Sequence, residues 1–183
     1  MHSFEPAPAI SDLLRNNIQI NGFTELDFVH VHEFAVTEVE GTANLRIFPD
    51  RSGHNTLFGN DDSAEKVPVE TISLDIALQH EPSVDVVKID AKGAGPFVLR
   101  GMNETIHRNP DIIILLEFAP VDLNRAGVSP KAFLKEIGGL GFIVHKVDDV
   151  TGELQPALQS ELLNCFSVNL HLRRAPMADE RLS

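Results

Sequence analysis

Residues 84–102, with the sequence VDVVKIDAKGAGPFVLRGM, constrain the fold of this chain more than any other segment. An apolar run ends in Asp90, the chain then turns through glycines, and a helix is predicted to begin at Pro96. In an open α/β sheet, ligands bind beyond the carboxyl ends of the strands, so we predict that Asp90 faces a bound ligand. The alternative is that Asp90 caps the following helix, because Asp is favoured where a helix begins.

The composition indicates a single soluble domain. A chain of 183 residues can bury a substantial core without disulfides, and its one cysteine, Cys165, permits no internal disulfide. No signal peptide is recognisable, and no apolar run reaches the roughly 18 residues of a membrane helix. We therefore expect a cytoplasmic protein without a membrane segment. A formal net charge of −12 also disfavours nucleic acid as a partner, since phosphates are bound by Lys and Arg.

Strands and helices are predicted to alternate along the chain. One helix begins at Pro8 and ends at Asn21 and Gly22. The other helices are predicted at 96–107 and 130–137, and the strands at 26–31, 34–36, 44–48, 67–72, 84–89, 111–117, 141–147 and 163–172. This order predicts an α/β fold with a mostly parallel sheet and an antiparallel last strand. Residues 112–116 are apolar without alternation, which indicates a strand covered on both faces.

Residues 1–172 are interpreted as one domain, and residues 173–183 as a disordered tail. The connection from 49 to 66 is long for a compact domain, and such loops are often functional or mobile.

Two further carboxylates are candidate site residues. Glu5 lies at the expected carboxyl end of a strand, where it could accept hydrogen bonds from both hydroxyls of a ribose. Its alternative role is to stabilise the N-terminus of the helix that follows. Glu117 ends a strand next to that of Asp90, so it could line the same cleft as a base or as a polar contact to substrate. Its alternative role is a helix cap or a salt bridge.

Other motifs give weaker signals. Gly93 and Gly95 suggest a dinucleotide fingerprint, but Val98 occupies the third glycine position of G-x-G-x-x-G. His30 and His32 would share one strand face, but no third ligand is spaced to complete a metal site, so we predict none. Cys165, in a predicted apolar strand, is interpreted as a small buried hydrophobe and not as a nucleophile.

Short motifs also occur in a characteristic order over residues 3–147. They are F-E-P at 4–6, L-L-R-N-N-I at 13–18, Asn21-Gly22, Ala35-Val36 with Gly41, the apolar segment 69–74, V-K-I-D at 87–90, V-L-R-G at 98–101, and the apolar segment 113–117. In this order the chain resembles the FkbM family of S-adenosylmethionine-dependent methyltransferases.

The resemblance implies a Rossmann-like class I methyltransferase fold, a three-layer sandwich. It also implies methyl transfer from S-adenosylmethionine to a hydroxyl oxygen on a sugar or another small metabolite. Glu5 would then hold the cofactor ribose, Ala35 and Val36 would lie near the adenine, and Asp90 would face the reactive centre. Asp90 and Glu117 are the candidates to take up the proton of the hydroxyl.

The chain differs from the family pattern at two places. Lys92 and Gly95 stand where the pattern D-x-E-G-x-E has its two glutamates. The family's first strand and glycine-rich turn precede F-E-P, whereas only three residues precede Phe4 here, so we expect an amino-terminally truncated domain that lacks its central strand. The alternative is a rearranged sheet that closes the gap. The alternative function is a non-catalytic binding or assembly module. A nucleotide-binding oxidoreductase is less favoured because the glycine spacing fails.

Overall fold

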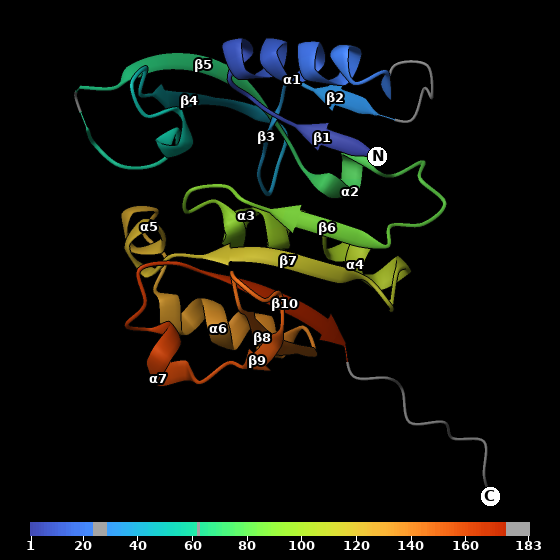
Figure 1. The fold of residues 1–183 in the computed structure, drawn as a ribbon, viewed down its shortest axis with the longest axis vertical. Coiled ribbons are helices and arrows are strands. Elements are labelled where there is room, and N and C mark those ends of the chain that lie inside the picture. Colours follow the sequence, from blue (N-terminus) through green and yellow to red (C-terminus); the bar gives the residue numbers. More distant parts are fainter. Residues whose placement is uncertain (24–28, 62, 175–183) are drawn as a thin grey trace, which may run out of the picture. The chain divides into compact units, whose positions relative to one another are not determined.

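The computed structural model describes residues 1–23, 29–61 and 63–174. It shows a mixed α/β structure whose chain divides into two compact units (Figure 1). Unit 1 comprises residues 1–80 and 97–103, and unit 2 comprises residues 81–96 and 104–183. The α/β class is therefore confirmed. Residues 26–28 of the strand predicted at 26–31 lie outside the described residues.

Unit 1 begins with a small parallel sheet and one helix. Strand β1 (His2–Phe4) pairs in parallel with β2 (His30–His32), and α1 (Pro8–Ile20) lies between them in the chain. As predicted, α1 begins at a proline, which suits the first helical position because the missing N–H would be unpaired there. It ends at Asn21, and Gly22 follows with a φ of 72°, a conformation that glycine adopts without strain.

The second sheet of unit 1 has the strand order β3-β5-β4. Its strands are β3 (Ala35–Val36), β4 (Gly41–Ile47) and β5 (Glu65–Ile72), of which β3 and β5 are parallel and β4 and β5 antiparallel. The loop between β4 and β5 contains a short 3-10 helix, η2 (Ser52–His54), and α2 (Leu74–Ala77) follows β5. Buried side chains of Ala7, Ala35, Leu45 and Val69 form the core of this unit.

Unit 2 is built on a five-stranded sheet with the order β6-β7-β10-β8-β9. The strands are β6 (Val86–Ile89), β7 (Ile113–Phe118), β8 (Phe142–Val147), β9 (Leu154–Pro156) and β10 (Val168–Arg174). Only β6 and β7 pair in parallel; the other three pairings are antiparallel. The antiparallel last strand is thus confirmed, but the sheet is mixed and not mostly parallel, because β10 inserts between β7 and β8 and a short turn joins β8 to β9.

One face of this sheet carries the core of unit 2. Ile114, Leu116 and Phe118 of β7 are fully buried, and Phe118 stacks on Phe133 of α6 (Pro130–Gly139) with ring centroids 6.4 Å apart. Two short helices that the sequence did not predict also belong to unit 2: α5 (Pro120–Arg125) and α7 (Gln159–Leu162).

The helix predicted at 96–107 is two helices, α3 (Gly95–Arg100) and α4 (Asn103–Arg108). The break falls at Gly101, which packs so tightly that a Cβ there would overlap the carbonyl oxygen of Thr37. The Gly101 carbonyl in turn accepts a hydrogen bond from the amide of Asp75. The contacts of the Gly101 backbone with Thr37 and Asp75 therefore end α3, although the apolar periodicity of the sequence would continue the helix.

The last predicted strand is also shorter than expected. Residues 159–162 form α7, and β10 begins only at Val168, so Cys165 lies outside the strand in which it was predicted. β10 extends to Arg174, two residues into the segment predicted as a tail, and the remainder of that segment lies outside the described residues. No helix in the described parts of the chain has the length and apolar character needed to cross a membrane.

Three histidines cluster on one face of the β1–β2 pair. His2 lies opposite His30, and its Nδ1 is 3.0 Å from Nε2 of His32. The rings of His2 and His32 stack. The ring of Phe4 also stacks on His32, with the two ring centroids 4.6 Å apart. Burial lowers the pKa of His32, and the charges of His2 and His30 lower it further. A hydrogen bond between two imidazole nitrogens also needs one of them to be unprotonated.

We expect Gly101→Ala to destabilise the protein by about 1–3 kcal/mol, because the added Cβ overlaps backbone that must shift. Urea unfolding measures this loss. The matched control is Gly138→Ala: Gly138 is exposed within α6 and its Cβ would meet nothing, so the variant should gain about 0.5–1 kcal/mol from helix propensity. Equal stabilities of the two variants would contradict the close approach at Gly101.

We expect the histidine cluster to make stability sensitive to mild acid. Because the folded-state pKa of His32 is lowered, its contribution is complete above the ordinary value of 6.5 and is lost as the pH falls through the folded-state value. Urea midpoints at pH 7.5 and pH 5.5, values chosen to bracket the ordinary histidine pKa of about 6.5, should therefore differ less in His32→Gln than in the wild type. His54→Gln, at an exposed position in η2, should retain the wild-type difference. An unchanged difference in His32→Gln would refute this role.

Candidate functional site

Asp90 and Glu117 lie at the same edge of the sheet in unit 2. β6 and β7 are parallel neighbours, and Ile89 at the end of β6 is paired with Leu116 of β7. Asp90 directly follows Ile89 and Glu117 directly follows Leu116, so this register places the two carboxylates beside each other. The sequence predicted this arrangement because the carboxyl ends of neighbouring parallel strands meet at one edge.

Each carboxylate forms an ion pair with a lysine. Oδ2 of Asp90 is 3.3 Å from Nζ of Lys88, and the Asp90 side chain is 60% exposed. Oε1 of Glu117 is 2.5 Å from Nζ of Lys92, and the Glu117 side chain is only 15% exposed. The Lys92–Glu117 pair is therefore the more shielded of the two.

The charge environment favours the ammonium form of Lys92. Burial acts against the charge, but the hydrogen bond to Glu117 and the charges of Glu117, Asp90 and Asp122 together outweigh it and raise the pKa of Lys92. Lys92 thus lies near three carboxylates and contacts Glu117 directly, while Asp90 and Asp122 pair with Lys88 and Arg125. The sequence reasoning noted Lys92 only as a departure from a pattern and missed it as a partner of Glu117. The sequence signal for this pairing is the position of Lys92, two residues after Asp90.

The two glycines after β6 are required by packing. Gly93 has a φ of 80°, and a Cβ there would lie 2.6 Å from the carbonyl oxygen of Asp122 in α5. A Cβ on Gly95 would lie 2.9 Å from Cδ1 of Leu116. The glycine turn therefore allows α5 and the start of α3 to approach the end of the sheet, and it keeps the backbone beside Asp90 and Glu117 compact.

Glu5 lies in unit 1, directly after β1. Its Oε1 accepts a hydrogen bond of 2.8 Å from the backbone N–H of Ala7, the residue before α1. The structure thus shows the contact proposed as the alternative role of Glu5, at the start of the following helix. Burial raises the pKa of Glu5, against the opposing effect of the Ala7 hydrogen bond. No other hydrogen bond from the described residues reaches this carboxylate.

Ala35 and Val36 form β3 in unit 1. The Ala35 side chain is buried in the core of this unit with Ala7, Leu45 and Val69, and Val36 is half-buried. Ala35 can therefore offer a ligand its backbone but not its side chain. Of the predicted site residues, the structure brings Asp90 and Glu117 together in unit 2, while Glu5, Ala35 and Val36 belong to unit 1.

Other reactive side chains are not organised as sites. Sγ of Cys165 lies 3.2 Å from the carbonyl oxygen of Leu162, and burial raises the pKa of the thiol. The rings of His2, His30 and His32 stack or tilt against one another. Within residues 1–23, 29–61 and 63–174, no group of three His, Cys, Asp or Glu is arranged to hold a metal ion.

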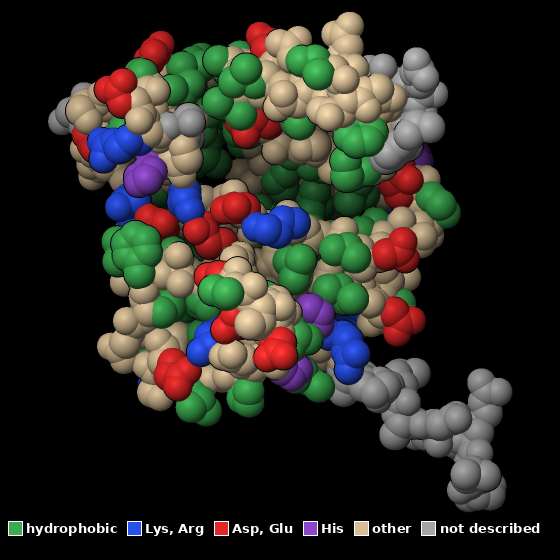
Figure 2. Space-filling model, viewed as in Figure 1, with side chains coloured by type: hydrophobic (Ala, Val, Ile, Leu, Met, Phe, Trp, Pro, Cys, Tyr) green, Lys and Arg blue, Asp and Glu red, His purple; other side chains and the backbone are tan. Residues whose placement is uncertain are grey.

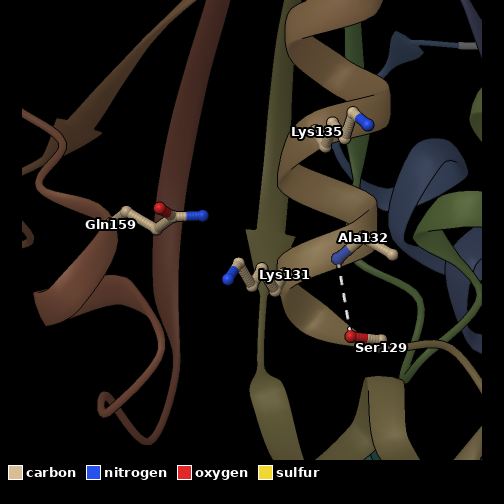
Figure 3. Close-up of a pocket in the computed structure, with 5 residues that line it drawn as sticks. All are labelled: Ser129, Lys131, Ala132, Lys135 and Gln159. Carbon is tan, nitrogen blue, oxygen red and sulfur yellow. Dashed lines mark hydrogen bonds between the residues drawn. The ribbon is translucent and has the colours of Figure 1, made fainter.

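A shallow hollow of about 360 Å³ lies in unit 2 beside α6, away from the predicted residues. It is lined by Ser129, Lys131, Ala132, Lys135 and Gln159. Figure 3 shows Lys131 and Gln159 extending toward each other, while Lys135 points away from Gln159. The hydroxyl of Ser129 is already occupied as the cap of α6, because it accepts a hydrogen bond from the N–H of Ala132.

Comparisons with known proteins show a family from the sequence and a similar fold from the structure. The sequence model of the methyltransferase FkbM domain matches residues 1–144. The crystal structure of methyltransferase FkbM from Methylobacillus flagellatus KT is similar in fold, with a TM-score of 0.54 and 11% sequence identity, over 93% of this chain. The chain spans only 36% of the length of that protein. No curated protein matches the sequence. Because the domain model covers most of the chain, the protein belongs to the family of FkbM methyltransferase domains.

Proposed function

We propose that this chain takes part in methyl transfer from S-adenosylmethionine to a hydroxyl group of a sugar or another small metabolite. Family membership supports the methyl transfer. The strand order β6-β7-β10-β8, with β10 antiparallel to both neighbours, supports a Rossmann-like class I fold. The observation that carries the proposal is the placement of Asp90 beside Glu117 at the carboxyl ends of two parallel strands.

The residues of unit 1 are compatible with a bound ribose and adenine. Glu5 is half-buried and uses Oε1 for the Ala7 amide, which leaves Oε2 to accept a hydrogen bond from a ribose hydroxyl. Val36 is half-buried at the end of β3 and offers an apolar contact to adenine, whereas Ala35 contributes through its backbone. When bound, S-adenosylmethionine supplies an electrophilic methyl group.

The protein must align the acceptor hydroxyl and remove its proton. Asp90 suits the second role better than Glu117. Its side chain is largely exposed and its lysine partner is 3.3 Å away, whereas an ammonium group directly holds one oxygen of the shielded Glu117. We assign Asp90 as the proton acceptor and the Glu117–Lys92 pair as the group that positions the end of the sheet next to it.

Calorimetric titration of the chain with S-adenosylmethionine tests the proposed cofactor site. We expect Glu5→Ala to weaken binding about 10- to 100-fold, because a hydrogen bond to a charged group contributes about 1.5–3 kcal/mol. Asp90→Asn should weaken it much less, since Asp90 is assigned to the acceptor. Glu70→Ala, at an exposed position on β5, is the matched control and should bind like the wild type.

An absence of binding by the folded wild-type chain would overturn the proposed function for this chain. It would favour the alternative, a non-catalytic module that retains the fold. Equal losses in Glu5→Ala and Glu70→Ala would remove Glu5 from the cofactor site.

The structural role of the Lys92–Glu117 pair is tested by stability. We expect Lys92→Met to destabilise the protein by about 1–3 kcal/mol, because it leaves a shielded carboxylate without its cation. Lys88→Met removes the partner of an exposed carboxylate and should cost less than about 1 kcal/mol. Urea unfolding at neutral pH compares the two, and Lys92→Met combined with Glu117→Gln should recover part of the loss. A larger loss in Lys88→Met would contradict the assignment.

A further inference from the structure

The backbone at Glu5 is held by β2 and by the start of α1. The N–H of Glu5 donates a hydrogen bond of 3.0 Å to the carbonyl oxygen of His32, the last residue of β2. The Glu5 carboxylate accepts a hydrogen bond from the N–H of Ala7. Phe4, the residue before Glu5, stacks on the ring of His32. His32 therefore contacts both Glu5 and the residue before it, so its position fixes the place where β1 ends.

Four aromatic rings lie on one face of the β1–β2 pair. The register pairs His2 with His30 and Phe4 with His32, and residues two apart on a strand point to the same face. Nδ1 of His2 is 3.0 Å from Nε2 of His32, and the ring centroids of His2 and His30 are 5.0 Å apart. Each strand has only three residues, and a two-stranded sheet is marginally stable by itself. The pairing of β1 with β2 therefore depends on these side-chain contacts.

The hydrogen bond between His2 and His32 exists in only part of the histidine titration. One nitrogen must donate and the other must accept, so at least one of the two rings has to be neutral. When both rings are protonated, two N–H donors and two positive charges face each other. The ordinary pKa of histidine, about 6.5, places this change in mild acid. A lower pH therefore replaces an attraction between β1 and β2 by a repulsion.

The acidic side chains that follow the two strands are engaged elsewhere. The carboxylate of Glu5 turns to the start of α1. Glu33, which follows β2, forms an ion pair of 2.5 Å with Arg15 of α1. Burial lowers the pKa of His32, and the charges of the other two histidine rings lower it further. The surroundings of the cluster therefore favour its neutral form.

We infer that His32 is a positioning residue for Glu5, and that protonation of both His2 and His32 displaces Glu5 and weakens cofactor binding. The inference rests on the proposed contact between Glu5 and the ribose of S-adenosylmethionine. In the neutral cluster, the paired rings hold the end of β1 against β2 and keep Oε2 of Glu5 in place for a ribose hydroxyl. In the doubly protonated cluster, the end of β1 moves and the carboxylate moves with it. Cofactor binding is thereby linked to the loss of a proton from the cluster.

Calorimetric titration with S-adenosylmethionine at pH 7.5 and pH 5.5, values chosen to bracket the ordinary histidine pKa of about 6.5, measures this linkage. We expect the wild-type affinity to be about three- to tenfold lower at the lower pH, because binding releases one proton whose pKa lies at or below the ordinary value. His32→Gln keeps a hydrogen-bonding group opposite His2 but does not titrate, so its two affinities should differ less than about twofold. At the higher pH it should bind more tightly than His32→Ala, which has neither the hydrogen bond nor the ring.

Two further variants separate the cluster from other titrating groups. Figure 2 shows a His side chain exposed at the surface over the loop between β4 and β5, which contains η2. His54 is exposed in η2 and is not part of the cluster, so His54→Gln should retain the wild-type ratio of affinities. Glu5→Ala should bind weakly at both pH values with a ratio near one, because the cluster acts through Glu5. Circular dichroism at both pH values establishes that each variant is folded.

Nuclear magnetic resonance gives a readout that needs no cofactor. The Glu5 amide donates to the carbonyl oxygen of His32, so its chemical shift reports the position of the end of β1. In the isotope-labelled wild-type chain, we expect this shift to change with the midpoint of the His32 ring. In His32→Gln the change should be much smaller.

Equal wild-type affinities at the two pH values would overturn the inference. An equal loss in His32→Gln would also overturn it, because the dependence would then belong to Glu5 itself. A Glu5 amide that does not follow the histidine titration would exclude the positioning role. An absence of binding at both pH values is a failure of the proposed function and removes this regulation with it. That case is recognised by a Glu5 amide that still follows the histidines in a chain that does not bind the cofactor.

Discussion

The position of the candidate site depends on the register of β7 in the five-stranded sheet. Ile114, Leu116 and Phe118 are fully buried on one face of the sheet, and each such side chain contributes about 1.5–3 kcal/mol relative to an exposed one. An exposed ion pair such as Lys88–Asp90 contributes about 0–1 kcal/mol. A slip of one residue would turn Glu117 into the core and the apolar set out of it. The hydrophobic pattern of β7 therefore sets the register that places Glu117 beside Asp90, and the shielded Lys92–Glu117 ion pair stabilises the end of the sheet within that register.

Elements with local signals were predictable from the sequence, and elements that depend on distant contacts were not. The start of α1 at Pro8 and its end at Asn21 and Gly22 follow from backbone preferences that the sequence shows directly. The break between α3 and α4 depends on Gly101 meeting the backbone of Thr37, a contact that helical periodicity cannot reveal. The short strand β9 is defined by its pairing with β8, and the insertion of β10 between β7 and β8 makes the sheet mixed and not mostly parallel.

In the candidate site, the acidic residues were predictable from the sequence, whereas their partners were not. Asp90 and Glu117 were predictable because neighbouring parallel strands end at the same edge of a sheet. The ion pair of Lys92 with Glu117 was not predictable, because it depends on the path of the turn through Gly93. For Glu5 the sequence left two roles open, and the contact to the Ala7 amide shows the structural one. That contact occupies one carboxylate oxygen, so it does not exclude a ligand at the other. A single carboxylate can begin a helix and bind a hydroxyl together.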